Sequence, residues 1–138
     1  MIKNNIAQYS GERNSFVCLD ITNNEFPEAD LWICRDCFFH LSFDDTLRAL
    51  QKYIESGIPY ILTTTHSNVD TFNNVDTNTG DFRLIDLFSS PYYFPRSILF
   101  RIEDCTKGLN PKEMCLWPRD QVIDSVRKIR EVISKNTD

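Results

Sequence analysis

The spacing of apolar positions in the first half of the chain predicts a strand, a helix and a second strand. Leu31–Cys34 is apolar at every position, which is typical of a central strand covered on both faces by helices. An apolar stripe over residues 42–57 predicts a helix, and Ser42 with Asp45 three positions later forms a capping box at its start. β-Branched and aromatic residues over 60–65 predict the second strand. Together these segments form a βαβ unit, in which the two strands run parallel.

The rest of the chain predicts shorter elements around this unit. Residues 1–9 resemble the last turns of a helix, and residues 16–20 form the pattern of a short buried strand. Residues 98–102 and 114–117 predict an antiparallel hairpin, and Pro118 opens a helix with an apolar stripe opposite its basic residues. We therefore expect an α/β domain with a mixed sheet of four or five strands and flanking helices.

Residues 67–96 lack a persistent period and are rich in Asn, Asp, Thr and Pro. Irregular stretches of this length are uncommon in compact domains and usually form a functional lid or a locally disordered segment. We expect one of these two outcomes here.

Length and composition limit the class of protein. The 138 residues suggest one domain over residues 1–138, and 41% hydrophobic with 25% charged residues is an ordinary globular composition. A net charge of -5 provides no cationic surface field for duplex nucleic acid. No apolar segment approaches the roughly 20 residues needed to span a bilayer, so we expect no membrane span. The first residues lack the apolar run of a secretory signal, so we expect a cytoplasmic protein with its five cysteines reduced.

Polar side chains follow both strands of the predicted βαβ unit. Arg35, Asp36 and His40 come after the first strand, and His66 comes after the second. In open α/β sheets the ligand crevice lies beyond the carboxyl ends of the strands, so these groups should meet at one edge. Each histidine is either a loop or capping residue or a group that contacts ligand and transfers protons. Asp36 needs a partner, which is either Arg35 or a bound ligand.

Cys34 and Cys37 form a CxxC pair close to His40, which suggests a zinc site or thiol redox chemistry. A closed zinc site usually uses a second pair with similar spacing, whereas Cys105 and Cys115 are ten positions apart. Within a strand, positions i and i+3 also point to opposite faces. We therefore expect no metal site.

Several segments together resemble a known family. They are A-D-L-W-I-C-R-D-C-F-F-H-L-S at residues 29–42, Y-I-L-T-T-T at 60–65, T-G-D-F-R-L-I-D-L at 79–87, P-Y-Y-F-P at 91–95 and C-L-W-P at 115–118. With F-V-C-L-D-I-T at residues 16–22, they resemble the carboxyl-terminal half of class I S-adenosylmethionine-dependent methyltransferases, whose fourth strand ends with R-D and a nearby histidine. The resemblance implies an incomplete Rossmann-like sheet.

The resemblance also implies roles for individual residues. Asp20 and Ile21 would lie beside the adenine of S-adenosylmethionine, and Arg35 and Asp36 would border its methionine moiety. Asp36, His40 and His66 would be the catalytic candidates on the side of the methyl acceptor, a small molecule or a peptide. Methyl transfer depends mainly on positioning, and a base contributes only where the acceptor must lose a proton.

The glycine-rich cofactor loop of this family has no counterpart here, and neither does the acidic residue that holds the ribose. The resemblance therefore implies the substrate-side half of a methyltransferase, truncated or split, with little activity alone. The alternative is a non-catalytic binding or oligomerisation module derived from the same fold. Without the missing strands, Leu31–Cys34 would expose an edge. That edge would pair with residues 16–19 in an antiparallel fit or with a second copy in a homodimer. The other expected partner is a separate chain that supplies the cofactor half.

Overall fold

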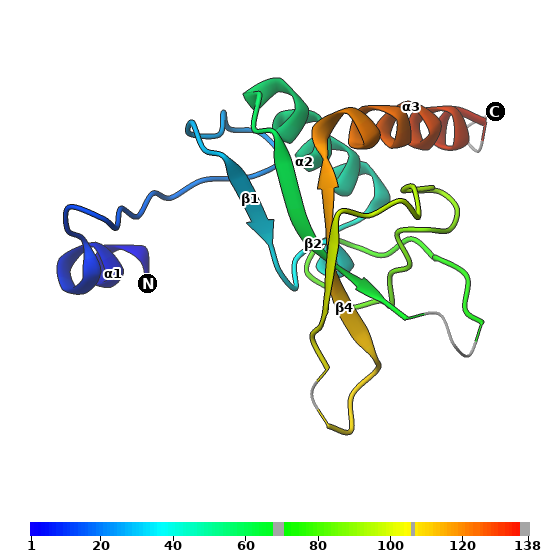
Figure 1. Cartoon of the computed structure of the whole chain (residues 1–138), viewed down its shortest axis with the longest axis horizontal. Helices are drawn as coiled ribbons and strands as arrows, with labels where there is room; N and C mark the ends of the chain where they lie inside the picture. The colour runs from blue at the N-terminus through cyan, green and yellow to red at the C-terminus, as the bar shows by residue number, and fades with distance from the viewer. Residues whose placement is uncertain (68–70, 106, 136–138) are drawn as a thin grey trace.

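The computed structural model describes residues 1–67, 71–105 and 107–135, and within them it shows a four-stranded mixed sheet with flanking helices (Figure 1). The strands lie in the order β1-β2-β4-β3. The elements along the chain are α1 (Ile2–Tyr9), β1 (Leu31–Cys34), the 3-10 helix η1 (Phe38–His40), α2 (Phe43–Ser56), β2 (Tyr60–His66), β3 (Phe100–Glu103), β4 (Lys112–Pro118) and α3 (Arg119–Lys135).

The predicted βαβ unit is confirmed. β1 and β2 pair in parallel, with Leu31 opposite Tyr60, and α2 forms the crossover. The Ser42 side chain accepts a 3.1 Å hydrogen bond from the Asp45 backbone N–H, so the helix begins with the expected cap. Gly57 ends it with a φ of 76°, a conformation that glycine adopts without strain. No helix in the described part of the chain is long and apolar enough to cross a membrane.

The antiparallel part of the sheet is also confirmed. β4 pairs with β2 on one side and with β3 on the other, antiparallel in both cases. β3 and β4 form the predicted hairpin. β3 begins at Phe100 rather than at residue 98, and β4 runs from Lys112 to Pro118 rather than from 114 to 117. The α/β class and the mixed sheet therefore follow the prediction, although this architecture is not specific to one family.

The two faces of the sheet differ in how they are covered. Trp32 and Cys34 point toward α2, and Trp32 packs against Tyr53 with ring centroids 5.6 Å apart. Side chains of a strand alternate between faces, so Ile33 points to the other side, where it is 60% exposed. The pairing aligns apolar residues across all four strands on that side. This open sheet face consists of Leu31, Ile33, Tyr60, Leu62, Phe100, Ile102 and Leu116.

Two predictions about the first third of the chain are wrong. Residues 16–20 form no strand and pair with no strand of the described chain. They run as an irregular segment in which Phe16 and Leu19 are half-buried and the other three residues are exposed. β1 is an edge strand of the sheet, not a central one, because within the described residues it pairs with β2 alone. The antiparallel fit of residues 16–19 to its free edge is therefore not formed.

The described part of residues 67–96 contains no helix or strand, but it is not a disordered loop. Ile85, Leu87, Tyr92 and Phe94 belong to the core, and Phe94 packs against Trp117 with centroids 5.0 Å apart. The expectation of local disorder is wrong for these residues, because their apolar side chains pack individually rather than with a helical or strand period. The alternative of a functional lid stays a prediction. Positions 68–70 lie outside the described residues.

Candidate functional site

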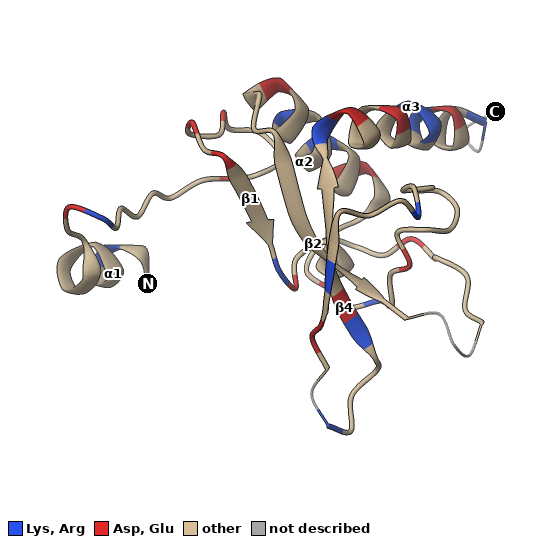
Figure 2. Ribbon diagram, in the orientation of Figure 1, with Lys and Arg blue, Asp and Glu red and all other residues tan. Residues whose placement is uncertain are grey.

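Charged residues lie at one edge of the sheet, where β1 ends and β4 begins (Figure 2). Parallel pairing puts the carboxyl ends of β1 and β2 side by side. The antiparallel strand β4 begins at the same edge, where Lys112 is the pairing partner of His66. The edge therefore combines residues from the βαβ unit with residues from the hairpin, and we call it the polar rim.

Two cations and two carboxylates form an ion-pair network in the polar rim. Lys112 Nζ lies 2.5 Å from Asp36 Oδ1 and 3.6 Å from Asp104 Oδ2. Arg35 donates two hydrogen bonds to Asp104, of 2.9 and 2.8 Å, and these are the main reason that the pKa of Asp104 is lowered. Arg35 Nε is 4.0 Å from Asp36, so the main partner of Asp36 is Lys112 and Arg35 is secondary. The four charges balance one another.

The Asp36 backbone lies in the left-handed region, with a φ of 53°. Aspartate is one of the few residues other than glycine that adopt this conformation with modest strain. The turn brings the Asp36 N–H to within 2.9 Å of Thr64 Oγ1, which accepts its hydrogen bond. The polar rim is therefore joined to β2 through the backbone as well as through charge.

His40 and His66 lie on either side of two phenylalanine rings. The Phe39 centroid is 4.6 Å from that of His40 and 5.2 Å from that of His66, and Phe82 contacts both histidines. His40 Nδ1 donates to the Asp81 carbonyl at 2.8 Å, because a carbonyl can only accept. Both histidines thus belong to one aromatic cluster at the polar rim.

His66 is buried and its ring is held as a neutral acceptor. Its Nδ1 accepts a 3.1 Å hydrogen bond from the Ile85 backbone N–H, which leaves a proton on Nε2. Burial, and secondarily the nearby Lys112 ammonium, lower the pKa of His66 below its ordinary value. A histidine in this state holds the irregular segment at Ile85 against β2 and is unprotonated at neutral pH.

The three catalytic candidates share an edge, and one of them, His66, lines a pocket there. A polar pocket of about 260 Å³ is lined by His66, Ser67, Asp86, Phe88, Arg96, Arg101 and Glu113. Asp36 and His40 are not among these residues. The structure therefore brings Asp36, His40 and His66 to the same end of the sheet, and of the three only His66 lines this pocket.

Asp20 and Ile21 lie away from the polar rim. The Asp20 carboxylate accepts hydrogen bonds from the side chains of Asn23 and Thr22 and from the Thr22 backbone, and these bonds lower its pKa. Thr22 lines a pocket beside the middle of α2.

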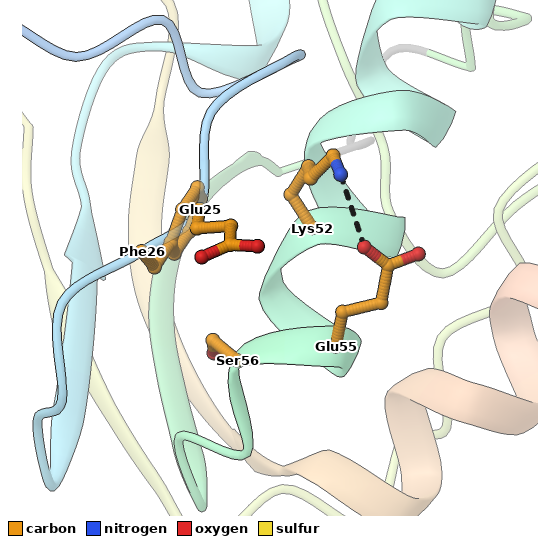
Figure 3. Close-up of a pocket in the computed structure, with 5 residues that line it drawn as sticks. All are labelled: Glu25, Phe26, Lys52, Glu55 and Ser56. Atoms are coloured by element: carbon orange, nitrogen blue, oxygen red, sulfur yellow. Dashed lines mark hydrogen bonds and ion pairs between the residues drawn. The ribbon is translucent and has the colours of Figure 1, made fainter.

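The chain then continues to the carboxyl end of α2, opposite the polar rim. There Glu25 and Phe26 line a pocket of about 310 Å³ together with Lys52, Glu55 and Ser56 (Figure 3). Lys52 is paired with Glu55 at 3.1 Å in this pocket. The adenine-side residues expected from the resemblance are therefore separated from Arg35 and Asp36.

The thiols of Cys34 and Cys37 lie closer together than their spacing in the sequence predicts. β1 ends at Cys34 and the chain turns at Asp36, so Cys37 returns to hydrogen-bond with the Cys34 thiol. This contact raises the pKa of Cys34, and burial raises it further. The same contact lowers the pKa of Cys37, and burial opposes that shift. The expectation that the two side chains point to opposite faces is wrong, because strand geometry does not continue past Cys34. Within the described residues, no group of three or more His, Cys, Asp or Glu could hold a metal ion.

Lys112, Asp104 and Phe82 are rim residues that sequence analysis did not identify. The predicted hairpin could have indicated Lys112 and Asp104. An antiparallel strand that pairs with residues 60–65 must begin at the carboxyl end of that strand, which is the polar rim. Phe82 lies in the irregular stretch and had no such signal.

The residues that the resemblance assigns to S-adenosylmethionine do not fit the cofactor in this chain alone. Asp20 lies next to Thr22, beside the middle of α2, whereas Asp36 lies in the polar rim. Arg35 and Asp36 also form ion pairs with residues of the hairpin. Comparison with known proteins identifies no relative: no family model matches the chain, and neither does any curated protein or solved structure.

Proposed function

We propose that this protein is a non-catalytic binding module, built on a methyltransferase-like α/β fold, that contacts another polypeptide through the open sheet face. The observation that carries the proposal is the row Ile33, Leu62, Leu116 and Phe100, whose members are consecutive pairing partners across the four strands. Ile33 and Phe100, at the two edges, are both more than half exposed. An apolar band therefore crosses the full width of the sheet, and no helix or strand of the described residues covers it.

An uncovered apolar band of this kind points to a partner. Sheets that face water on one side normally carry polar residues there, and extended apolar patches on soluble proteins usually mark interaction sites. The polar rim supports the same conclusion from the other direction. Its charges already neutralise one another, and His66 is committed to a backbone donor, so these groups serve the fold itself.

Calorimetric titration of the chain with S-adenosylmethionine, and separately with S-adenosylhomocysteine, tests this function. We expect no heat of binding from either compound, because the assigned residues are separated and internally paired. A dissociation constant below about 1 mM, which corresponds to about 4 kcal/mol of binding free energy, would overturn the proposal. A matched titration of Asp36→Asn would then show whether such binding uses the polar rim.

The second candidate function is the substrate-side half of a split methyltransferase, with a separate chain supplying the cofactor loop. The observation that favours it is the polar rim itself, because Asp36, His40 and His66 do lie at the carboxyl edge of the parallel pair, as the resemblance implies. The genomic sequence immediately upstream separates the two candidates. A reading frame for a strand followed by a glycine-rich turn would favour the split enzyme, and its absence would favour the binding module.

A further inference from the structure

The N-terminal arm, residues 1–19, is the second uncovered apolar part of the chain. It consists of α1 and an extended segment, and it projects away from the sheet beyond β1 (Figure 1). α1 contains no buried residue. Ile6 and Tyr9 are 45% and 60% exposed, and Val17 in the extended segment is 61% exposed.

α1 needs a packing partner to be a stable helix. Isolated helices shorter than about 12 residues are marginal in water, and α1 has eight residues and no side-chain hydrogen bond at its N-cap. Ile2, Ile6 and Tyr9 are spaced i, i+4 and i+7, so they lie on one side of the helix. The helix therefore presents an apolar stripe that is available for packing.

The stripe and the open sheet face match in size and in charge. Eight helical residues extend about 12 Å, and the four residues of β1 extend about 13 Å. Lys3 is the single charged residue of α1, and the seven residues of the open sheet face carry no charge. Lys112 lies on the same side of the sheet at the polar rim, where Asp36 and Asp104 pair with it. A nearly uncharged helix can cover a charge-free apolar surface without burying an unpaired ion.

The arm leaves the body on the side that favours exchange with another molecule. Phe26, just after the arm, packs against Trp32 with centroids 4.8 Å apart, and Trp32 points toward α2. The arm therefore starts from the helix-covered side of its own sheet and projects past the β1 edge. It does not cover the open face of its own sheet (Figure 1). A second copy placed at that edge would receive the arm directly and return its own.

We propose that the open sheet face is covered by α1 from a second copy of this chain, in a dimer that exchanges its N-terminal arms reciprocally. This inference rests on the proposed function and names the polypeptide that the binding module recognises. Exchange of identical elements is a low-cost route to a symmetric dimer, because the same contact forms twice. It provides both the packing that α1 lacks and the layer that the sheet lacks.

Light scattering and sedimentation of the full chain, over a range of concentrations, are the first test. We expect a dimer whose dissociation constant rises about tenfold or more in Ile6→Glu and in Ile33→Glu, because each buries an unpaired carboxylate in the interface. Leu109→Glu is the matched control, since Leu109 is 66% exposed in the β3–β4 connection and lies on neither surface. A monomer, or a dimer that neither substitution weakens, would overturn the exchange.

Cross-linking distinguishes exchange from an arm that folds back on its own sheet. In a background where the exposed Cys18 and Cys105 and the half-buried Cys37 are replaced by serine, one chain carries Ile6→Cys and a second carries Ile33→Cys. After mixing, a bifunctional maleimide about 10 Å long, the usual separation of packed layers, should join the two different chains. The background without new cysteines should show no link.

A third chain carries both Ile6→Cys and Ile33→Cys. A link that forms within this chain, and not between the two singly substituted chains, would overturn the proposal in favour of an arm that folds back on its own sheet. The proposed function fails differently, through tight binding of S-adenosylmethionine in the calorimetric titration. A monomer that gives no heat would thus reject the exchanged dimer alone, and a cross-linked dimer that binds the cofactor would reject the non-catalytic function alone.

Discussion

Replacing Lys112 with methionine should destabilise the protein by about 1–2 kcal/mol. The Lys112 side chain is 12% exposed and its ammonium contacts Asp36, whose side chain is 37% exposed. Removing one partner of a fully buried pair costs about 3–5 kcal/mol, and removing an exposed pair costs about 0–1 kcal/mol. The half-buried pair falls between these limits, because Arg35 remains 4.0 Å from Asp36 and water reaches the carboxylate. Methionine keeps the length of the lysine stem without its charge.

Urea denaturation at neutral pH measures this free energy, and a thermal midpoint lower by about 3–8 °C should accompany it. The control is Arg48→Met, whose exposed i,i+4 pair with Asp44 is worth about 0.3–0.5 kcal/mol. In a double-mutant cycle, Asp36→Asn should recover about 1 kcal/mol of the Lys112→Met loss, since asparagine also tolerates the left-handed backbone. A Lys112 loss no larger than that of Arg48, or a cycle without coupling, would refute the ion-pair assignment.

Three further predictions concern a histidine, a thiol pair and the core. Burial lowers the pKa of His66 from 6.5, so the unfolded chain takes up the proton first as the pH falls below about 6.5, and the free energy of unfolding should decrease there. Urea titrations at pH about 7.5 and 5.5 should show a smaller decrease for His66→Asn than for the unsubstituted chain. Iodoacetamide should modify Cys37 faster than Cys34, as measured by mass spectrometry, and equal rates would contradict the thiol contact. Leu50→Ala, at a fully buried position, should cost about 2–5 kcal/mol by urea denaturation. The exposed position Leu109 should tolerate alanine with little loss.

The sequence predicted correctly those elements that are stabilised by residues within the element itself. The helix over residues 43–56 follows from its cap, its apolar stripe and its terminal glycine, all of which lie within the segment. Residues 16–20 have the composition of a strand, but a strand forms only where another strand accepts its hydrogen bonds. No such partner is available to them within the described residues, and composition cannot show that.

The polar rim was predictable in its position and not in its chemistry. Parallel strands determine that Asp36 and His66 share an edge, so their approach followed from the βαβ unit alone. The identity of the Asp36 partner depends on how the distant hairpin aligns, which puts Lys112 opposite His66. The approach of Cys37 to Cys34 depends on a single backbone torsion at Asp36, which no pattern of residue types encodes.

The most informative difference between expectation and structure is at β1. Its unbroken apolar sequence indicates a strand covered on both faces, whereas the structure covers one face and leaves Leu31 and Ile33 39% and 60% exposed. Tyr60 next to them and Phe100 at the far edge are exposed in the same way. A composition suited to burial, repeated across four strands on one face, is evidence for a layer that the isolated chain does not provide. The N-terminal arm is apolar, uncovered and joined to the same edge of the molecule, so a second copy can provide that layer.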